Sequence, residues 1–333
     1  MLTGFRIMQR EEKILYHINM DGQGIEIGPS HSPIVPKKDG HKVHVIDHMN
    51  REQLIEKYTG HDVQLENIEE VDFVWSGQPF AELTGKAGYY DWIIASHIIE
   101  HTTDFIGFLN DCDSIMKDDV VISLVIPYKR FCFDHFRANA GISEIINAHI
   151  HKSAIHSPGA VAEFYLNFVS KGGQIGWDYL KEGEYDLVHS VDKVRAEIAR
   201  AMGKKVYIDI HAWCFTPHSF RLIIHDLNSL GLVTFKEISF FPTAGNEFYV
   251  TLGRQGEGPG LSRMDMLKKI EEELEETENK KYIEELKESE RKLSEATREI
   301  ERIHDSTSWK VTRPLRELRL VPGRLSRLFK KSP

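Results

Sequence analysis

Short apolar runs rich in β-branched residues alternate with segments of helical periodicity through the first half of the chain. The apolar runs are residues 24–27, 43–46, 71–75, 92–95 and 120–126. Between them, residues 51–58 and about 101–116 carry apolar side chains at helical spacing. Strands that alternate with helices predict a parallel β-sheet covered by helices.

The alternation stops at about residue 138 and returns after residue 212. Residues 138–212 are rich in His and Gly and poor in strand runs, so we expect an insert or lid there. A helix is then predicted over 219–230, and strands over 233–241 and 247–252 are joined by turn residues at 243–246. The predicted fold is α/β: a Rossmann-like, doubly wound, mostly parallel seven-stranded sheet whose last strand is antiparallel.

After residue 254 the composition changes twice. Residues 255–263 are Gly-rich and indicate a linker, and residues 264–305 are dominated by Glu, Lys, Arg and Leu. Apolar residues recur there at close to 3-4 spacing, with a break near Lys281; they are Leu267, Ile270, Leu274, Ile283, Leu286, Leu293 and Ile300. This pattern predicts a coiled coil that assembles a homo-oligomer. The alternative is a single solvated helix held by charge pairs four residues apart.

The predicted organisation therefore has five parts. Residues 1–20 form an N-terminal helical segment, 21–254 the main domain, 255–263 the linker, 264–305 the coiled coil and 306–333 a basic amphipathic tail.

Composition and charge narrow the class of protein. With 41% hydrophobic residues the 333-residue chain can bury a large core, and no apolar run approaches the roughly 18 residues that span a bilayer. With no signal-peptide pattern either, the expected location is the cytoplasm. Cys112, Cys132 and Cys214 are too scattered for a disulfide framework and are expected in the core.

The net charge of −9 is unevenly distributed along the chain. The last 24 residues, from Lys310, carry eight Lys or Arg and one acidic residue, so the remainder carries −16. An acidic body argues against nucleic-acid binding, whereas a basic tail suits anionic lipid or an acidic partner.

The first two apolar runs end in residues that suit a nucleotide-like ligand. Glu26 lies in the first run, and Gly28 follows it without a side chain that would block a ligand from the backbone. The second run ends in Asp47, where a carboxylate can accept hydrogen bonds from both ribose hydroxyls. Together they predict a site for an adenosine-containing ligand.

Six segments between residues 24 and 254 carry a family resemblance: EIGPS, VHVIDH, VDFVWSG, DWIIASHIIEH, IPYKRFCFDHFR and NEFYVTL. With them the chain resembles class I S-adenosylmethionine-dependent methyltransferases, in particular bacterial members associated with polysaccharide pathways. The resemblance implies S-adenosylmethionine as the cofactor. The residues that it places around the cofactor are Glu26, Gly28, Pro29, Ser30, Asp47, Trp75, Ser76, Gly77, Ser96 and His97.

Within that pattern, Glu26 and Gly28 lie beside the methionine part of the cofactor, Asp47 holds the ribose and residues 75–77 flank the adenine. Two departures stand out. Pro29 and Ser30 follow Gly28 in place of further glycines, and Ser76 stands where relatives often have an acid. They motivate an alternative, a degenerate methyltransferase fold that acts as a scaffold. A nicotinamide oxidoreductase is disfavoured by the missing GxGxxG motif and by the final hairpin.

Candidate catalytic residues follow the fourth and fifth predicted strands. His97 and His101, with Glu100 between them, are candidate proton acceptors, and on a helix they would share one face. In the alternative, His101 only caps or packs that helix. Arg137 is a candidate clamp for a carboxylate or phosphate of the acceptor, or else a partner of Asp134.

No metal site is predicted. The HExxH motif is missing and no second group of ligands is evident. His149, His151 and His156 are interpreted as loop or surface residues.

Residues 305–315 resemble a segment found near cell-surface polysaccharide glycosyltransferases. Leucines beyond it interleave with arginines, which predicts peripheral contact with the inner face of the cell membrane; a disordered basic tail is the alternative. The sequence therefore predicts a methyltransferase that O-methylates a sugar or glycan-linked acceptor in cell-surface polysaccharide biosynthesis.

Overall fold

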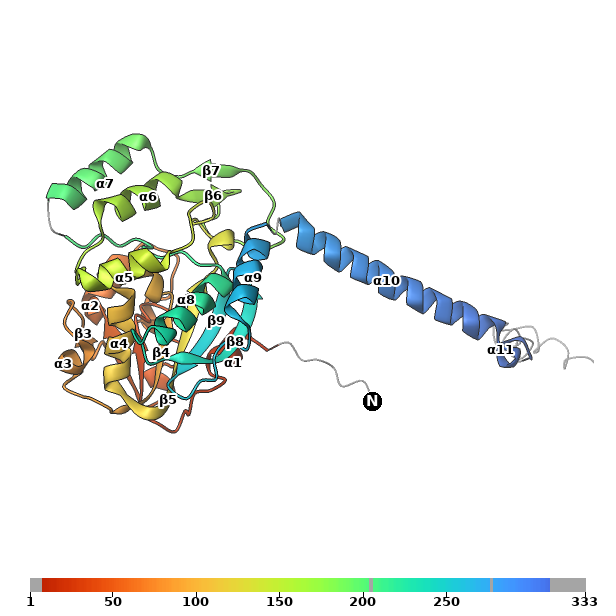
Figure 1. Cartoon of the computed structure of the whole chain (residues 1–333), viewed down its shortest axis with the longest axis horizontal. Coiled ribbons are helices and arrows are strands. Elements are labelled where there is room, and N and C mark those ends of the chain that lie inside the picture. The colour runs from red at the N-terminus through yellow and green to blue at the C-terminus, as the bar shows by residue number, and fades with distance from the viewer. Residues whose placement is uncertain (1–7, 204–205, 276–277, 312–333) are drawn as a thin grey trace, which may run out of the picture. The chain divides into compact units, whose positions relative to one another are not determined.

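The computed structural model of the chain describes residues 8–203, 206–275 and 278–311. The chain divides into two compact units, Met1–Glu275 and Glu276–Pro333, and each is described by itself (Figure 1). In the described ranges, no helix combines the length and the apolar character needed to cross a membrane.

A seven-stranded sheet forms the centre of the first unit, in the order β3-β2-β1-β4-β5-β9-β8. The strands are β1 (Gly24–Ile27), β2 (Val43–Asp47), β3 (Phe73–Val74), β4 (Tyr90–Ser96), β5 (Met116–Pro127), β8 (Lys236–Ala244) and β9 (Glu247–Gly253). The pairs among β1 to β5 are parallel, whereas β9 runs antiparallel to both β5 and β8. The predicted fold class is confirmed, including the antiparallel last strand.

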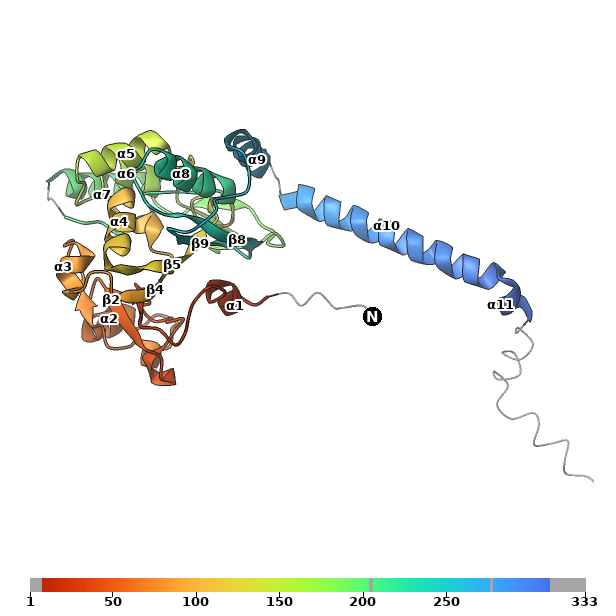
Figure 2. The same ribbon diagram turned by 60° about the horizontal axis from the view of Figure 1, so that its bottom comes forward.

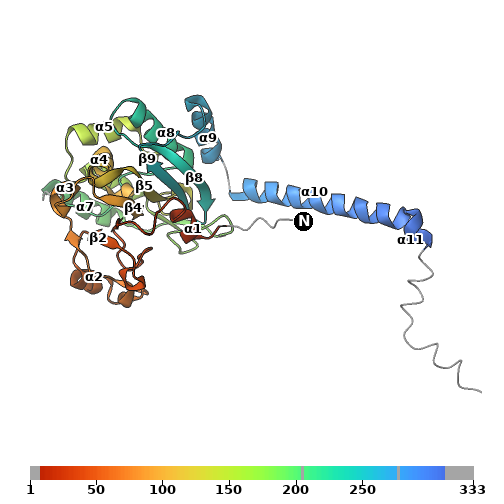
Figure 3. The same cartoon turned by 90° about the horizontal axis from the view of Figure 1, so that it is seen from below.

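The two faces of this sheet are covered differently. Helices α3 (Phe80–Thr84), α4 (Phe105–Ile115), α5 (Ile142–Ile150) and α8 (Pro217–Ser229) pack on one face and form the main core with alternate strand residues such as Ile93 and Ala95 (Figures 2 and 3). The other face, with Trp92 and Ile94, packs on the short helix α1 (Arg10–Ile14) and on the chain that follows it. Helix α2 (Arg51–Tyr58) matches its predicted range.

The predicted insert forms a substructure with its own small core. It contains α5, α6 (Pro158–Asn167), β6 (Val169–Lys171), β7 (Tyr185–Leu187) and α7 (Val191–Gly203). Strands β6 and β7 pair with each other and not with the main sheet, and α6 and α7 lie beside them (Figure 1). Val161, Phe164 and Ile210 are buried in this core. The segment therefore contains the strands that its sequence did not indicate.

Helix α9 (Arg263–Glu275) belongs to the first unit, although residues from 264 were assigned to the coiled coil. Its Met266 is fully buried, and Glu273 accepts hydrogen bonds from the backbone and the ring of His218 at the start of α8. Packing on α8 thus uses the apolar side of α9 that a coiled coil would need.

The second unit contains α10 (Glu278–Asp305) and α11 (Thr307–Val311). Leu293, Ile300 and Ile303 on α10 are exposed, with 69%, 54% and 44% of their surface accessible. Charge pairs such as Arg291 with Glu288 and Glu295 lie along the same helix. The basic tail from residue 312 lies outside the described residues.

Candidate functional site

The carboxyl ends of β1, β2, β3 and β4 lie along one edge of the sheet. Ile27 pairs with Ile46 on one side and with Ala95 on the other. The strand order reverses between β1 and β4, which is the crevice where open α/β sheets bind their ligands. The register therefore brings Gly28, Asp47 and Ser96 to this crevice although they are distant in sequence.

Asp47 ends β2 and is buried, with 3% of its surface exposed. Its Oδ2 accepts a hydrogen bond from the Ser30 amide at 3.2 Å, and its Oδ1 accepts one from the His48 amide at 2.7 Å. The ring of His48 lies 2.6 Å from the same Oδ1. Because an ionised carboxylate offers about four acceptor positions, Asp47 retains capacity for a ligand hydroxyl.

Ser30 follows Pro29 in the turn after β1 and has a left-handed backbone, with φ of 51°. Its buried Oγ has no hydrogen-bond partner among the residues that the structure describes. A buried hydroxyl beside Asp47 is an unused polar group of the kind that a bound ligand satisfies. Asp47 and Ser30 together therefore fit an adenosine ribose.

Glu26 holds the loop after β1. Its carboxylate accepts hydrogen bonds from the amides of Ile34 at 2.7 Å and Val35 at 3.1 Å. Burial raises the pKa of Glu26 to about 7, although the two amides lower it. Both carboxylate oxygens of Glu26 are bound by backbone amides of the loop, so Glu26 fixes the conformation of this loop.

Gly28 makes room for a side chain of the protein. It has φ of +66°, and a Cβ at this position would overlap Cδ1 of Ile98, which comes from the turn after β4. The sequence interpretation, in which the glycine opens space for a ligand, is therefore corrected: the space beside this α-carbon is filled by Ile98.

Residues 75–77 follow β3 in a short, internally bonded turn. The Trp75 ring donates to the carbonyl of Gln78 at 2.8 Å and packs edge-on against Phe80. Ser76 donates from its amide and hydroxyl to the Gln78 side chain. Gly77, with φ of +103°, has open space where a side chain would be. The turn adjoins Asp47, because the Trp75 amide donates to the Asp47 carbonyl at 2.8 Å.

At the end of β4, Ser96 and His97 join a charged network that the sequence did not indicate. Arg10 of α1 donates to Ser96 Oγ at 3.1 Å and to Glu247 at 2.7 Å. Glu247 lies at this edge because β9 is antiparallel and starts opposite Pro127. His97 Nε2 lies 2.9 Å from the other Glu247 oxygen. A hollow of about 530 Å³ adjoins this network between α1 and the β8–β9 turn.

The charges of this network change the role expected of His97. Burial alone lowers the pKa of His97, but the carboxylates of Glu100 and Glu247 outweigh this effect and raise the pKa to about 9. His97 is therefore protonated at neutral pH. A ring that already carries its proton cannot serve as the proton acceptor, and its two N–H groups face the carboxylates of Glu247 and Glu100.

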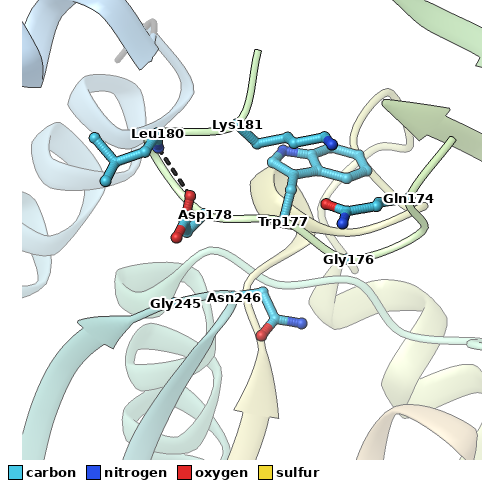
Figure 4. A pocket seen from close by; sticks show the side chains of 8 residues that line it. All are labelled: Gln174, Gly176, Trp177, Asp178, Leu180, Lys181, Gly245 and Asn246. Atoms are coloured by element: carbon cyan, nitrogen blue, oxygen red, sulfur yellow. Dashed lines mark hydrogen bonds between the residues drawn. The ribbon is translucent and has the colours of Figure 1, made fainter. Parts of the chain in front are cut away.

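A second hollow, also of about 530 Å³, lies between the insert and the β8–β9 turn (Figure 4). Trp177, Asp178 and Lys181 line it from the insert, and Gly245 and Asn246 line it from the turn. It combines one aromatic face with a carboxylate, an amide and a cation.

The segment after β4 is a turn where the sequence predicted a helix from about residue 101. His97 has a left-handed backbone with φ of 55°, Ile99–His101 form a 3-10 helix, and α4 begins only at Phe105, where Asp104 accepts the Gly107 amide. His97 and His101 therefore do not share a helical face. Both instead flank Glu100, which is fully buried.

Arg137 is buried and lies 2.7 Å from Asp134. Of the two predicted alternatives, an acceptor clamp and a partner of Asp134, the structure shows the second. Arg137 Nη1 also donates to the backbone carbonyl of His211 at 2.7 Å. The pKa of Asp134 is about 2: burial raises it, but His211 and Arg137 lower it further. With 3% of its surface exposed, Arg137 holds the chain together here and is not placed to clamp an acceptor.

Two further His positions differ in their surroundings. His149 lies 2.9 Å from Asp104, at the start of α4. His156 is buried with 6% exposure and packs against Tyr207, which corrects its expected surface position. The three cysteines are buried, as predicted.

Among known proteins, the chain is similar only at low sequence identity to the solved structures described below. No family model and no curated protein matches it. A structure assigned to the Zn-dependent alcohol dehydrogenases of Rhodobacter sphaeroides is 13% identical over 75% of this chain and 91% of that one, with a TM-score of 0.38. An S-adenosylmethionine-dependent methyltransferase from Methanosarcina mazei is 13% identical over 73% and 97%, with a TM-score of 0.35.

A third likeness is the 1,6-didemethyltoxoflavin-N1-methyltransferase of Burkholderia thailandensis, with bound S-adenosylhomocysteine. It is 11% identical over 74% of this chain and 76% of that one, with a TM-score of 0.35. At these identities and TM-scores the likenesses do not decide which reaction the chain carries out.

Proposed function

We propose that the chain is an S-adenosylmethionine-dependent methyltransferase. The observation that carries this proposal is the position of Asp47, at the end of β2 beside the crevice between β1 and β4, in a sheet whose last strand in the chain, β9, is antiparallel. The unpartnered Ser30 hydroxyl beside Asp47 supports a ligand at this place. S-adenosylmethionine supplies a methyl group on a sulfonium, which an aligned nucleophile can accept.

Residues on one side of the crevice would bind the cofactor, and residues on the other side would orient the methyl acceptor. Asp47 would accept hydrogen bonds from the ribose hydroxyls, and the turn at residues 75–77 would flank the adenine. The Ser96 hydroxyl would donate to the acceptor oxygen, while Arg10 and Glu247 fix the positions of Ser96 and His97. Alignment in a site that excludes water is the main requirement of methyl transfer.

For the acceptor, we propose a hydroxyl of a sugar or glycan-linked molecule. The hollow between the insert and the β8–β9 turn supports this class, because Asp178, Lys181 and Asn246 can exchange hydrogen bonds with hydroxyls. The resemblance of residues 305–315 to a segment near polysaccharide glycosyltransferases gives further support. An untargeted methyl-transfer assay with sugar nucleotides and glycan extracts tests this acceptor class.

Isothermal titration of the full chain with S-adenosylmethionine tests the reaction class. Asp47→Ala should weaken binding at least about 100-fold, because hydrogen bonds to a charged group contribute roughly 1.5–3 kcal/mol each. Asp39→Ala, which removes an exposed carboxylate from the same loop region, is the control and should bind like the native chain. No binding by the native chain at millimolar ligand would exclude the enzyme.

A scaffold is the second candidate, and two observations favour it. Ile98 fills the space beside Gly28, and α10 exposes Leu293, Ile300 and Ile303. A scaffold would bind its partners equally well with Ala at position 47, whereas the enzyme would lose methyl transfer. Activity and partner binding measured on this one variant therefore separate the two functions.

For assembly, we propose that α10 pairs with α10 of a second chain. Its exposed apolar side chains lie seven residues apart at Leu293 and Ile300, which is coiled-coil spacing. Truncation after Glu275, which keeps the packed α9, should leave a folded first unit of lower mass by light scattering. An unchanged oligomeric state would refute the coiled coil.

For the basic tail, we propose peripheral contact with an anionic membrane. Sedimentation with vesicles that contain anionic lipid should capture the full chain, and truncation after Val311 should abolish capture. Equal capture of both chains would exclude the tail as the membrane contact.

A further inference from the structure

The insert returns to the sheet edge beside the turn after β4, and backbone hydrogen bonds fix the two segments together. The amides of Ala212 and Trp213 donate to the carbonyl of Glu100 at 2.8 and 3.2 Å. The Trp213 ring donates to the carbonyl of Thr102 at 2.7 Å. His211 is thereby held beside Glu100 and His101 although about 110 residues separate them.

Glu100 is a fully buried carboxylate, and neither of its oxygens has a hydrogen-bond partner in the ranges that the structure describes. The nearest basic nitrogens are His97 Nδ1 at 3.5 Å and His211 Nε2 at 4.0 Å. An ionised carboxylate in the interior costs several kcal/mol unless it is paired or binds a metal. The protonated His97 therefore gives this carboxylate a charge contact at 3.5 Å, but neither oxygen receives the hydrogen bonds that its burial requires.

One of the neighbouring imidazoles, His211, is hydrogen-bonded as metal ligands usually are, and His101 has a carboxylate near one ring nitrogen. Asp134 Oδ2 lies 2.5 Å from His211 Nδ1, and Asp209 Oδ1 lies 2.9 Å from His101 Nδ1. A carboxylate beside one ring nitrogen fixes the orientation of the ring and leaves the other nitrogen for an ion. For His211, the remaining Nε2 is the atom that lies toward Glu100.

We propose that Glu100, His101 and His211 bind a divalent transition-metal ion. One ligand atom from each side chain lies within 4.8 Å of the other two. Two imidazoles and one carboxylate suit Zn²⁺ or Fe²⁺ better than the oxygen-loving Mg²⁺. Zinc bonds of about 2.1 Å set tetrahedral ligands roughly 3.4 Å apart, so the three side chains close by about an ångström on binding.

The surroundings provide both an entry path and a support. The His101 side chain is 29% exposed and the Asp209 side chain 58% exposed, so an ion can reach the site from that side. Arg137 donates a hydrogen bond to Asp134 and so fixes the carboxylate that orients His211. The buried Arg137–Asp134 pair therefore supports the proposed metal ligand. An ion can bind here whether or not the chain transfers methyl groups.

Equilibrium binding of Zn²⁺ to the full, tag-free chain tests the site. The chain is first treated with a chelator, and Zn²⁺ is then titrated against a chromophoric competitor. We expect one ion per chain bound tightly enough to compete, with no displacement by millimolar Mg²⁺. Co²⁺ in place of Zn²⁺ should give visible absorption bands of a site with nitrogen ligands.

Two variants test proposed ligands, and a third tests the carboxylate that orients His211. His211→Ala and Glu100→Gln should each weaken binding at least about 100-fold, and Asp134→Asn about 10- to 100-fold through the orientation of His211. His218→Ala is the matched control, because His218 also pairs with a carboxylate, Glu273, but lies outside the cluster. Its Zn²⁺ affinity and Co²⁺ spectrum should equal those of the native chain.

Either of two results would overturn the site. The first is no ion bound to the native chain at micromolar Zn²⁺. The second is a bound ion whose affinity does not change in Glu100→Gln, a variant that keeps the side-chain volume and removes only the charge. Circular dichroism of each variant confirms that the compared chains are folded.

Discussion

Along the carboxyl edge of the sheet, the half formed by β1, β2 and β3 meets the half formed by β4, β5 and β9 at the crevice between β1 and β4. In the first half, acidic side chains are bound by nearby backbone amides: Glu26 by Ile34 and Val35, and Asp47 by Ser30 and His48. The partners lie within 17 residues of each acid. This half is organised by its own loops.

In the second half, charged side chains bind one another across long stretches of sequence. Glu247 pairs with Arg10, 237 residues away, and His211 pairs with Asp134, 77 residues away. Removing one member of such a pair is strongly destabilising, because the remaining charge is left without a partner in the interior. Local loops therefore hold the acidic groups of the first half, whereas charge pairs between distant residues hold those of the second half.

The largest effect on this comparison is expected from Gly28→Ala in the first half. A left-handed backbone costs a residue with a side chain roughly 1–2 kcal/mol, and overlap with Ile98 adds a further 1–3 kcal/mol or so. Urea unfolding should show a loss of about 2–5 kcal/mol. A loss of only about 1–2 kcal/mol, the backbone part alone, would mean that Ile98 does not fill this space.

The double variant Gly28→Ala, Ile98→Ala separates the two causes of that loss. Relative to Ile98→Ala alone, adding Ala at position 28 should cost only the backbone part, about 1–2 kcal/mol. If Gly28→Ala weakens S-adenosylmethionine binding only by displacing Ile98, binding should recover in the double variant. If the ligand itself occupies the space beside Gly28, binding should stay weak in the double variant.

An intermediate effect is expected from Glu247→Gln in the second half. The pKa of Glu247 is lowered from 4.5 to about 2: burial raises it, but His97 and Arg10 lower it further. Since the folded chain binds this proton less readily than the unfolded chain, the stabilisation is fully present above about pH 5 and is lost as pH falls toward 2. The difference corresponds to roughly 3 kcal/mol.

Urea unfolding of both chains between pH 7 and pH 2.5 measures this effect. The native chain should lose its advantage over Glu247→Gln as the pH falls through this window, and the two curves should converge at the acid end. Glu257→Gln, an exchange in the loop after β9, is the control and should follow the native chain throughout. Parallel curves for the native chain and Glu247→Gln would show that the carboxylate is not ionised in the charged network.

The difference between the halves also explains what the sequence could predict. The sheet follows from apolar runs, whose ranges nearly match β1 and β2, because buried parallel strands are apolar throughout. Asp47 is predictable for a similar reason, since its role depends on its place at the end of a strand. The occupant of the space at Gly28 is not, because Ile98 enters it from a different turn.

The second half depends on contacts that the sequence does not display. Glu247 reaches His97 only because β9 is antiparallel, and His211 reaches Glu100 only because the insert returns to the sheet edge. The helix predicted over about 101–116 is present as α4, but it starts later, at Phe105, because Asp104 accepts the Gly107 amide there. One signal was available: Glu247 is the acidic residue that follows the Gly245-Asn246 turn, at the point where β9 must begin.

The smallest effect is expected from Arg10→Lys, which keeps the charge and removes the planar fork of donors. Arg10 donates to both Glu247 oxygens and to Ser96, whereas a lysine can reach one partner at a time. Because the Arg10 side chain is 37% exposed, we expect a loss near 1 kcal/mol, or about 2 °C in the melting temperature. Arg51→Lys in the first half is the matched exchange: Arg51 donates to the backbone carbonyl of Ile68 and should cost less than Arg10→Lys by calorimetry. An equal or larger shift for Arg51→Lys would mean that the two halves do not differ in how they hold their charges.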